Sequence, residues 1–255
     1  MIEKYLDNRL YTLYLFPFIL GSLTVFSFQP FNLTIVNFIV LPLFFYLIIY
    51  INKKSKNLYR KKPHKKNLFI FGTVFGFGFF ISGVHWITNS LTFDDNFKIL
   101  IPFGLFLIPL LLSLFFSLMV MIVSPFLSLN FVSIFLFSGS LAFSDYIRAK
   151  VLSGFPWNLW AYSNSWSIEI IQIIDQLGLF AFNLVTITIF MSPSILFLRM
   201  GMIKKGLFLI SIFLFILAIF IYGSFTLNKN RTVINSIDNN INVKIISPNF
   251  ELKYG

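Results

Sequence analysis

Cysteine is absent from the 255 residues, and charged residues are scarce. The missing cysteine excludes disulfides, thiolate metal sites and a thiol nucleophile within this sequence. Only 11% of the residues are charged, against about 25% in a typical soluble domain. Hydrophobic residues make up 57% of the chain. So few polar groups could not cover a core of that size, and we therefore predict a polytopic membrane protein.

The sequence also lacks the short motifs that mark common catalytic and cofactor sites. It contains no G-x-S-x-G elbow and no phosphate-binding loop, and its two histidines, His64 and His85, do not form a metal-ligand spacing. We expect no metal, no cofactor and no catalytic residue within these residues.

The net charge of +11 does not indicate a nucleic-acid partner, because the basic residues are concentrated in short segments between apolar runs. The richest of these is the segment from Lys53 to Lys66. We interpret it as a topology anchor at a membrane surface. The alternative is a patch that binds anionic lipid or nucleic acid.

Long apolar runs predict the membrane spans. Each is near the length needed to cross a hydrocarbon core of about 30 Å, and each is continuous rather than alternating, which favours helices over barrel strands. One uncharged stretch, from Ile99 to Ser144, is too long for a single helix, and Ser124-Pro125 is its expected break. The seven predicted spans are Tyr11–Phe28, Leu33–Ile51, Asn67–Ile87, Ile99–Val123, Leu127–Ile147, Gly178–Leu198 and Gly206–Phe225.

The distribution of basic residues predicts the orientation of these spans. The N-terminus and the even-numbered loops hold 13 lysines and arginines, whereas the opposite loops hold only Lys98, Arg148 and Lys150. The positive-inside rule then places the N-terminus in the cytoplasm. Seven crossings would place the residues from Thr226 onward outside.

The C-terminal residues have a different character. Residues 228–240 are polar and are typical of a linker, whereas Ile241 to Ile245 alternate with a period of two, as in a β-strand. A single strand is not a stable unit. We therefore expect the sequence to be cut off at the start of an extracytoplasmic domain that contains β-structure.

The segment from Ser144 to Ser163 has the richest chemistry in the chain. Asp145 and Arg148 are three residues apart, so they share a helix face and could pair. Gly154 and Pro156 would break the helix, and Trp157, Trp160 and Tyr162 suit the headgroup layer of a membrane. Two interpretations remain open for this segment, an aromatic belt without a ligand and a lip that binds lipid.

The third predicted span contains a G-x-x-x-G pair, Gly72 and Gly76, which predicts close packing against another helix. His85 and Trp86 end this span near the outer face. For His85 we favour a structural, hydrogen-bonded role over a titrating one.

Together, these features resemble the bacterial apolipoprotein N-acyltransferase family. Matching features are the turn from Ser27 to Asn32, the Gly- and Phe-rich third span that ends at Trp86, and the G-F-P-W sequence at residues 154–157 with Arg148 before it. Residues 243–249 are similar to the first strand of the family's nitrilase-like domain. Asp145 stands where the family usually has Glu, and Tyr254 where it usually has Trp.

The resemblance implies an acyltransferase. The family moves an acyl chain from a phospholipid donor to a cysteine thiol, and then to the N-terminal amine of a diacylglyceryl-cysteine lipoprotein. A Glu–Lys–Cys triad in the nitrilase-like domain performs both steps, since a carboxylate can deprotonate the thiol and a lysine can stabilise the oxyanion. Those residues would lie beyond Gly255, so this chain alone would lack the catalytic triad.

We thus predict an all-α transmembrane bundle of about seven helices over residues 1–226. Residues 227–255 would form a linker and the first strand of a truncated α/β nitrilase-like domain. The resemblance places the protein in the bacterial inner membrane with a periplasmic tail, in contact with membrane lipids and not with nucleic acid. Arg148, Trp157 and Tyr162 are the candidate substrate-binding residues. The alternative is a non-catalytic polytopic protein, such as a transporter subunit or a membrane scaffold.

Overall fold

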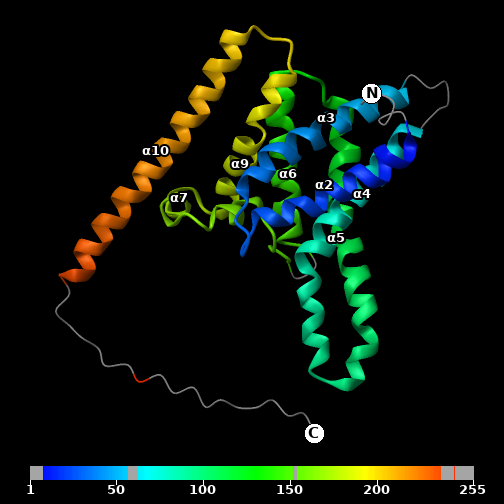
Figure 1. Cartoon of the computed structure of the whole chain (residues 1–255), viewed down its shortest axis with the longest axis horizontal. Helices are drawn as coiled ribbons and strands as arrows, with labels where there is room; N and C mark the ends of the chain where they lie inside the picture. The colour runs from blue at the N-terminus through cyan, green and yellow to red at the C-terminus, as the bar shows by residue number, and fades with distance from the viewer. Residues whose placement is uncertain (1–7, 57–62, 152–153, 237–243, 245–255) are drawn as a thin grey trace.

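The computed structural model describes residues 8–56, 63–151, 154–236 and 244, and within these ranges it contains helices and loops but no strand. Figure 1 shows the helices gathered into a bundle, with the last helix standing apart from the others. The all-helical prediction is therefore confirmed for the described residues. The predicted strand at residues 241–245 falls almost wholly outside them.

The first half of the chain forms the long helices of the bundle and several short helical turns. The N-terminal segment comprises η1 (Tyr11–Leu15), α2 (Phe16–Leu23) and η2 (Thr24–Ser27). After η3 (Thr34–Val36) come the long helices α3 (Asn37–Lys56) and α4 (Pro63–Val84). The turns η4 (His85–Thr92) and η5 (Asp95–Leu100) then lead into α5 (Ile101–Val123) and η6 (Ser124–Phe126).

The second half contains shorter helices and one very long one. Helix α6 (Phe131–Arg148) leads through a loop to η7 (Trp160–Asn164). Two single-turn helices follow, α7 (Ile168–Ile171) and α8 (Ile174–Leu177), and then α9 (Leu179–Phe190) and η8 (Ser192–Phe197). Helix α10 (Met202–Asn235) ends the described part of the bundle.

Five helical segments in the described ranges are long and apolar enough to cross a membrane, namely Thr34–Lys54, Lys65–Thr92, Asp95–Phe126, Leu179–Phe197 and Met202–Asn235. The other two predicted spans are also helical, but neither is among these five. The N-terminal one covers Tyr11–Ser27. The fifth begins at Phe131, not Leu127, because the break at Ser124-Pro125 extends through residues 127–130 before Asn130 caps α6. The count of seven crossings stays a prediction.

Helix α10 also differs from its prediction. The polar segment expected to be a linker begins inside this helix, which continues through Asn235. Residues 228–235 are therefore helical, since the backbone hydrogen bonds of a long helix extend readily into a polar segment that contains no Gly or Pro.

Glycines allow the helices of the first half to approach closely. A Cβ added at Gly72 or Gly76 would lie within 2.9 Å of the Cα atom of Ser117 or Ser113 on α5. This confirms the packing role predicted for the pair. In the same way, a Cβ at Gly21 of α2 would collide with the backbone of α4.

Phenylalanine rings fill the centre of the bundle. Phe44 of α3 stacks on Phe75 of α4, with ring centroids 3.8 Å apart, and Phe79 stacks on Trp160 at 5.3 Å. All four side chains are fully buried. Because Trp160 belongs to η7, this stack fixes the loop after α6 against the core, and it thereby positions the segment that the sequence predicted to carry chemistry.

Candidate functional site

The loop between α6 and η7 has a backbone shape that depends on two residues with positive φ. Gly154 has φ of 80°, and its backbone lies so close to the Ala149 carbonyl oxygen that a side chain there would collide with it. Asn158 has φ of 54°, a conformation that Asn adopts more readily than most residues. Between them, Pro156 leads into a turn at Trp157 and Asn158.

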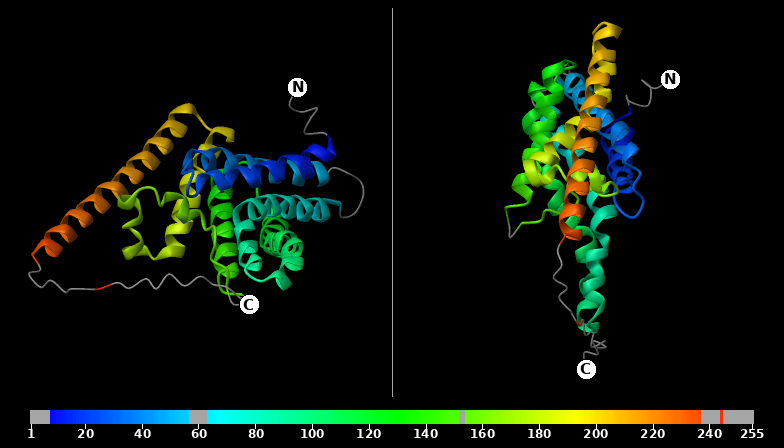
Figure 2. Two further views of the ribbon diagram at one scale, coloured as in Figure 1. Left: turned by 60° about the horizontal axis from the view of Figure 1, so that its bottom comes forward. Right: turned by 90° about the vertical axis from the view of Figure 1, so that its left-hand side faces the viewer.

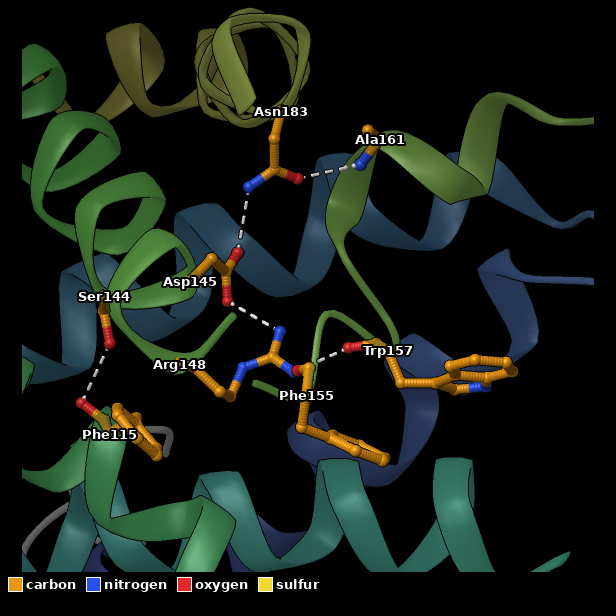
Figure 3. Close-up of polar contacts among 8 residues, drawn as sticks. All are labelled: Phe115, Ser144, Asp145, Arg148, Phe155, Trp157, Ala161 and Asn183. Atoms are coloured by element: carbon orange, nitrogen blue, oxygen red, sulfur yellow. Dashed lines mark hydrogen bonds and ion pairs between the residues drawn. The ribbon is translucent and has the colours of Figure 1, made fainter. Parts of the chain in front are cut away.

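Arg148, on the last turn of α6, holds this loop from inside. Its guanidinium donates one hydrogen bond to the Phe155 carbonyl and one to the Trp157 carbonyl, each at 2.7 Å (Figure 3). The guanidinium also lies over the Phe80 ring, 5.2 Å from its centroid. A guanidinium with five donors in a fixed plane can serve two carbonyls and a carboxylate at once, which an ammonium cannot do with the same geometry.

Asp145 neutralises this buried cation. One carboxylate oxygen accepts a hydrogen bond from Arg148 at 3.0 Å, so the predicted pairing of these two residues is confirmed. The side chains of Arg148 and Asp145 are only 1% and 3% exposed. Burial of an ion pair is costly unless its remaining hydrogen-bonding groups are satisfied, and both partners make further bonds.

Asn183, on α9, completes the network. Its amide group donates to the second carboxylate oxygen of Asp145 at 3.0 Å, and its carbonyl oxygen accepts from the Ala161 backbone N–H at 2.9 Å (Figure 3). Asn183 is fully buried. It therefore links α6, α9 and η7 through two hydrogen bonds. Sequence reasoning missed Asn183, although an Asn within the apolar run 179–190 was a signal that could have drawn attention to it.

A cavity of about 590 Å³ opens on the other face of the loop. Its walls come from three separate parts of the chain, residues 25–31, residues 82–86 and residues 156–165. Residues that line the cavity include Phe28, Gln29, Phe31, Ser82, His85, Trp86, Trp157, Asn158, Tyr162 and Ser165. Polar atoms from amides, hydroxyls and an imidazole line it together with aromatic rings, and no carboxylate is among its lining residues.

Two indoles form one wall of this cavity. The rings of Trp86 and Trp157 lie 5.3 Å apart, and 42% and 47% of these side chains are exposed. Trp86 donates from its indole N–H to the Gly83 carbonyl at 3.2 Å. Figure 3 shows the Trp157 ring directed away from Arg148. The pair therefore presents an exposed aromatic surface, and the backbone of Trp157 is held on its other side by the hydrogen bond from Arg148.

Tyr162 and His85 also contribute to the cavity lining. Burial raises the pKa of the Tyr162 hydroxyl, and the positive charge of Arg148 offsets part of that rise, so the hydroxyl remains protonated and able to donate at neutral pH. The Nδ1 atom of His85 lies 3.0 Å from the Ser82 carbonyl oxygen. A hydrogen bond of this kind is what the structural interpretation of His85 predicted.

The three candidate residues thus fall into two groups. Trp157 and Tyr162 line the cavity. Arg148 does not, because its guanidinium faces the Asp145 carboxylate and two backbone carbonyls. This geometry gives Arg148 a structural role behind the cavity in place of the substrate-binding role that we expected. Among the described residues, no group of His, Asp or Glu is arranged to hold a metal ion.

Comparison with known proteins connects this architecture to one family. Residues 20–192 match the family described as the apolipoprotein N-acyltransferase N-terminal domain. This range includes the cavity and the buried network behind it. The chain belongs to the apolipoprotein N-acyltransferase family.

Individual relatives agree with this assignment. The chain is 30% identical to the apolipoprotein N-acyltransferase of Rhodopseudomonas palustris over 177 residues, which cover 69% of this chain and 32% of the relative. The proteins of the same name from Rickettsia typhi and Brucella suis are 30% and 28% identical, and each match covers 91% of this chain. The matches span 43% and 42% of those relatives. The chain therefore covers less than half the length of the relatives it matches.

Proposed function

We propose that this chain is the membrane portion of a phospholipid-dependent acyltransferase that modifies the N-terminal diacylglyceryl-cysteine of lipoproteins. Family membership supports the reaction class. The catalytic triad would be contributed by a nitrilase-like domain, of which the residues after α10 would supply the first strand. The protein would lie in the bacterial inner membrane, with its N-terminus in the cytoplasm and residues after α10 in the periplasm.

The cavity bounded by Trp86, Trp157 and Tyr162 is the observation that carries this proposal. We assign to it the glycerol and headgroup region of the phospholipid donor. Three features support the assignment: indole rings suit the membrane interface, the Tyr162 hydroxyl can donate a hydrogen bond, and no lining carboxylate would repel a phosphate. An acyl chain attached to such a headgroup could remain in the adjacent bilayer.

The buried Asp145–Arg148–Asn183 network would keep the cavity in shape. Two carbonyls of the loop that carries Trp157 bind Arg148 directly, and the backbone next to Tyr162 is held by Asn183. Because the loop that carries Trp157 is already held in place, it would not have to become ordered when lipid binds. This lowers the free-energy cost of binding.

A chimaera tests the proposal. This chain would replace the matching membrane portion of the Rickettsia typhi relative, and transfer of a labelled acyl chain from phosphatidylethanolamine to a diacylglyceryl peptide would be measured. We expect Trp157→Ala to lower kcat/KM by about 5–30-fold, since removing an aromatic contact costs about 1–2 kcal/mol.

The matched control is Phe126→Ala, a large exposed side chain in η6, far in sequence from the cavity-lining segments. We expect it to leave kcat/KM unchanged. An active chimaera in which Trp157→Ala and Phe126→Ala behave alike would refute the cavity assignment. A correctly folded chimaera without any acyl transfer, but with substrate flux across a reconstituted bilayer, would favour the transporter alternative.

A further inference from the structure

A second cavity, of about 270 Å³, lies between α9 and α10. Phe182, Ile189 and Phe190 of α9 form one wall, and Ile216 and Ile219 of α10 form the opposite one. The lining is mostly apolar; Thr186 of α9 also contributes to it, and its hydroxyl accepts a hydrogen bond from Asn164. Phe182 and Phe190 are eight residues apart, so the cavity follows α9 for about 12 Å at 1.5 Å per residue.

This cavity is separate from the one that contains Trp157. The segment around η7 lies between them, since Tyr162 and Ser165 line the first cavity whereas Asn164 and Trp166 line the second. Asn164 donates hydrogen bonds to the Ala161 carbonyl and to Thr186 of α9, so the dividing segment is attached to the bundle. The two cavities can therefore hold different ligands.

Helix α10 contacts the bundle at its start, where Phe208 packs against Phe131 of α6, and in the region around this cavity. Only 11% of its most apolar 18-residue window is buried. Figures 1 and 2 show it diverging from α9 along its length. One close contact occurs at Gly223, whose Cα approaches the Glu169 carbonyl of α7 so closely that a side chain would collide with it. The cavity lies on the same face of α10 as Gly223, one to two turns before it.

From this arrangement, we propose that a phospholipid occupies the second cavity and inserts an acyl chain between α9 and α10. An apolar space between two membrane helices does not attract water, and leaving it empty would forfeit dispersion contacts along both walls. In a membrane, acyl chains would surround the exposed apolar side chains of α10, the helix that supplies Ile216 and Ile219 to the cavity. No other described segment fills the space.

The position of the polar lining residues orients this lipid. Thr34 of η3, Asn164 of η7 and Trp166 just after η7 line the cavity, and 52% of the Trp166 side chain is exposed. An indole at this level is typical of the membrane interface. The headgroup would lie near Trp166 and the acyl chain would extend toward Ile216. This site is independent of acyl transfer and would join α10 to the bundle.

Photo-crosslinking of the 255-residue chain in lipid nanodiscs tests the proposal. The probe is phosphatidylethanolamine with a diazirine on its acyl chain, and crosslinked peptides are located by mass spectrometry. We expect crosslinks at the cavity face of α10, around Ile216 and Ile219, to exceed those at the opposite face around Ile221. Equal labelling of both faces, as bulk lipid would give, would overturn the proposal.

Two matched variants sharpen the result. Ile216→Trp fills the cavity and should reduce crosslinking at its walls to the level of the opposite face, whereas Ile221→Trp, on the exposed face, should leave it unchanged. If Ile216→Trp fails to fold, Ile35→Trp closes the cavity from η3, where that side chain is 66% exposed. Undiminished labelling of the walls in a folded cavity-filling variant would also contradict the proposal.

Discussion

The ion pair of Asp145 and Arg148 allows a quantitative test of the buried network. Both side chains are almost completely inaccessible, and the carboxylate is the group that neutralises the guanidinium. Asp145→Leu removes the negative charge and leaves the cation buried. Breaking a buried pair in this way typically costs about 3–5 kcal/mol in the free energy of unfolding.

Arg148→Met should cost a similar amount for two reasons. It leaves the Asp145 carboxylate with Asn183 as its remaining partner, and it removes the donors to the Phe155 and Trp157 carbonyls. A hydrogen bond from a charged donor contributes about 1.5–3 kcal/mol. Part of this loss would be recovered if the two carbonyls turned toward the aqueous side of the loop.

The double variant Asp145→Leu/Arg148→Met separates charge burial from loop anchoring. Neither charge remains in the double variant. Its loss in the free energy of unfolding should therefore be smaller than the sum of the two single-variant losses by about 1.5–3 kcal/mol, as in coupled sites. The measurement is reversible unfolding of the chain in mixed micelles, followed by circular dichroism. Additive single effects would refute the view that the two charges stabilise each other, and a double variant as stable as wild type would refute loop anchoring by Arg148.

Two glycine substitutions test the helix contacts by the same unfolding measurement. Gly72→Ala should lower the free energy of unfolding by about 1–3 kcal/mol, because its Cβ would meet the α5 backbone. The control is Gly139→Ala, which has nothing within 4 Å of the added Cβ and should be neutral or stabilise by about 0.5–1 kcal/mol. Equal effects would contradict close packing at Gly72. Gly223→Ala should separate α10 from α7, because its Cβ would collide with the Glu169 carbonyl. The chain has no cysteine of its own, so spin labels can be attached to one cysteine introduced into each helix. The distance between the labels should lengthen, and an unchanged distance would refute this contact.

Sequence alone was sufficient for features that depend on local composition. The absence of charge over long runs predicted the apolar helices, and Ser124-Pro125 marked the break between α5 and α6. The spacing of Asp145 and Arg148 predicted their pairing, because residues three apart on a helix face the same side. The boundaries were less accurate at α6 and α10, where capping by Asn130 and continued backbone hydrogen bonding outweighed the pattern of hydropathy.

The candidate site depended on contacts between distant parts of the chain. Trp157 and Tyr162 could be selected as interfacial aromatics, but the cavity they line also needs residues 25–31 and 82–86. Asn183 is 38 residues from Asp145, and no local pattern indicated their hydrogen bond.

The amino-acid sequence by itself determined that this protein is a bundle of apolar helices with an aromatic segment after α6, because hydropathy and helix periodicity act over a few turns. Only the tertiary structure decided the role of Arg148. A cation beside aromatic residues at a membrane could equally well face a ligand or the interior. Its environment follows from the stacking of Trp160 on Phe79 and from the approach of α9, and these contacts direct the guanidinium inward.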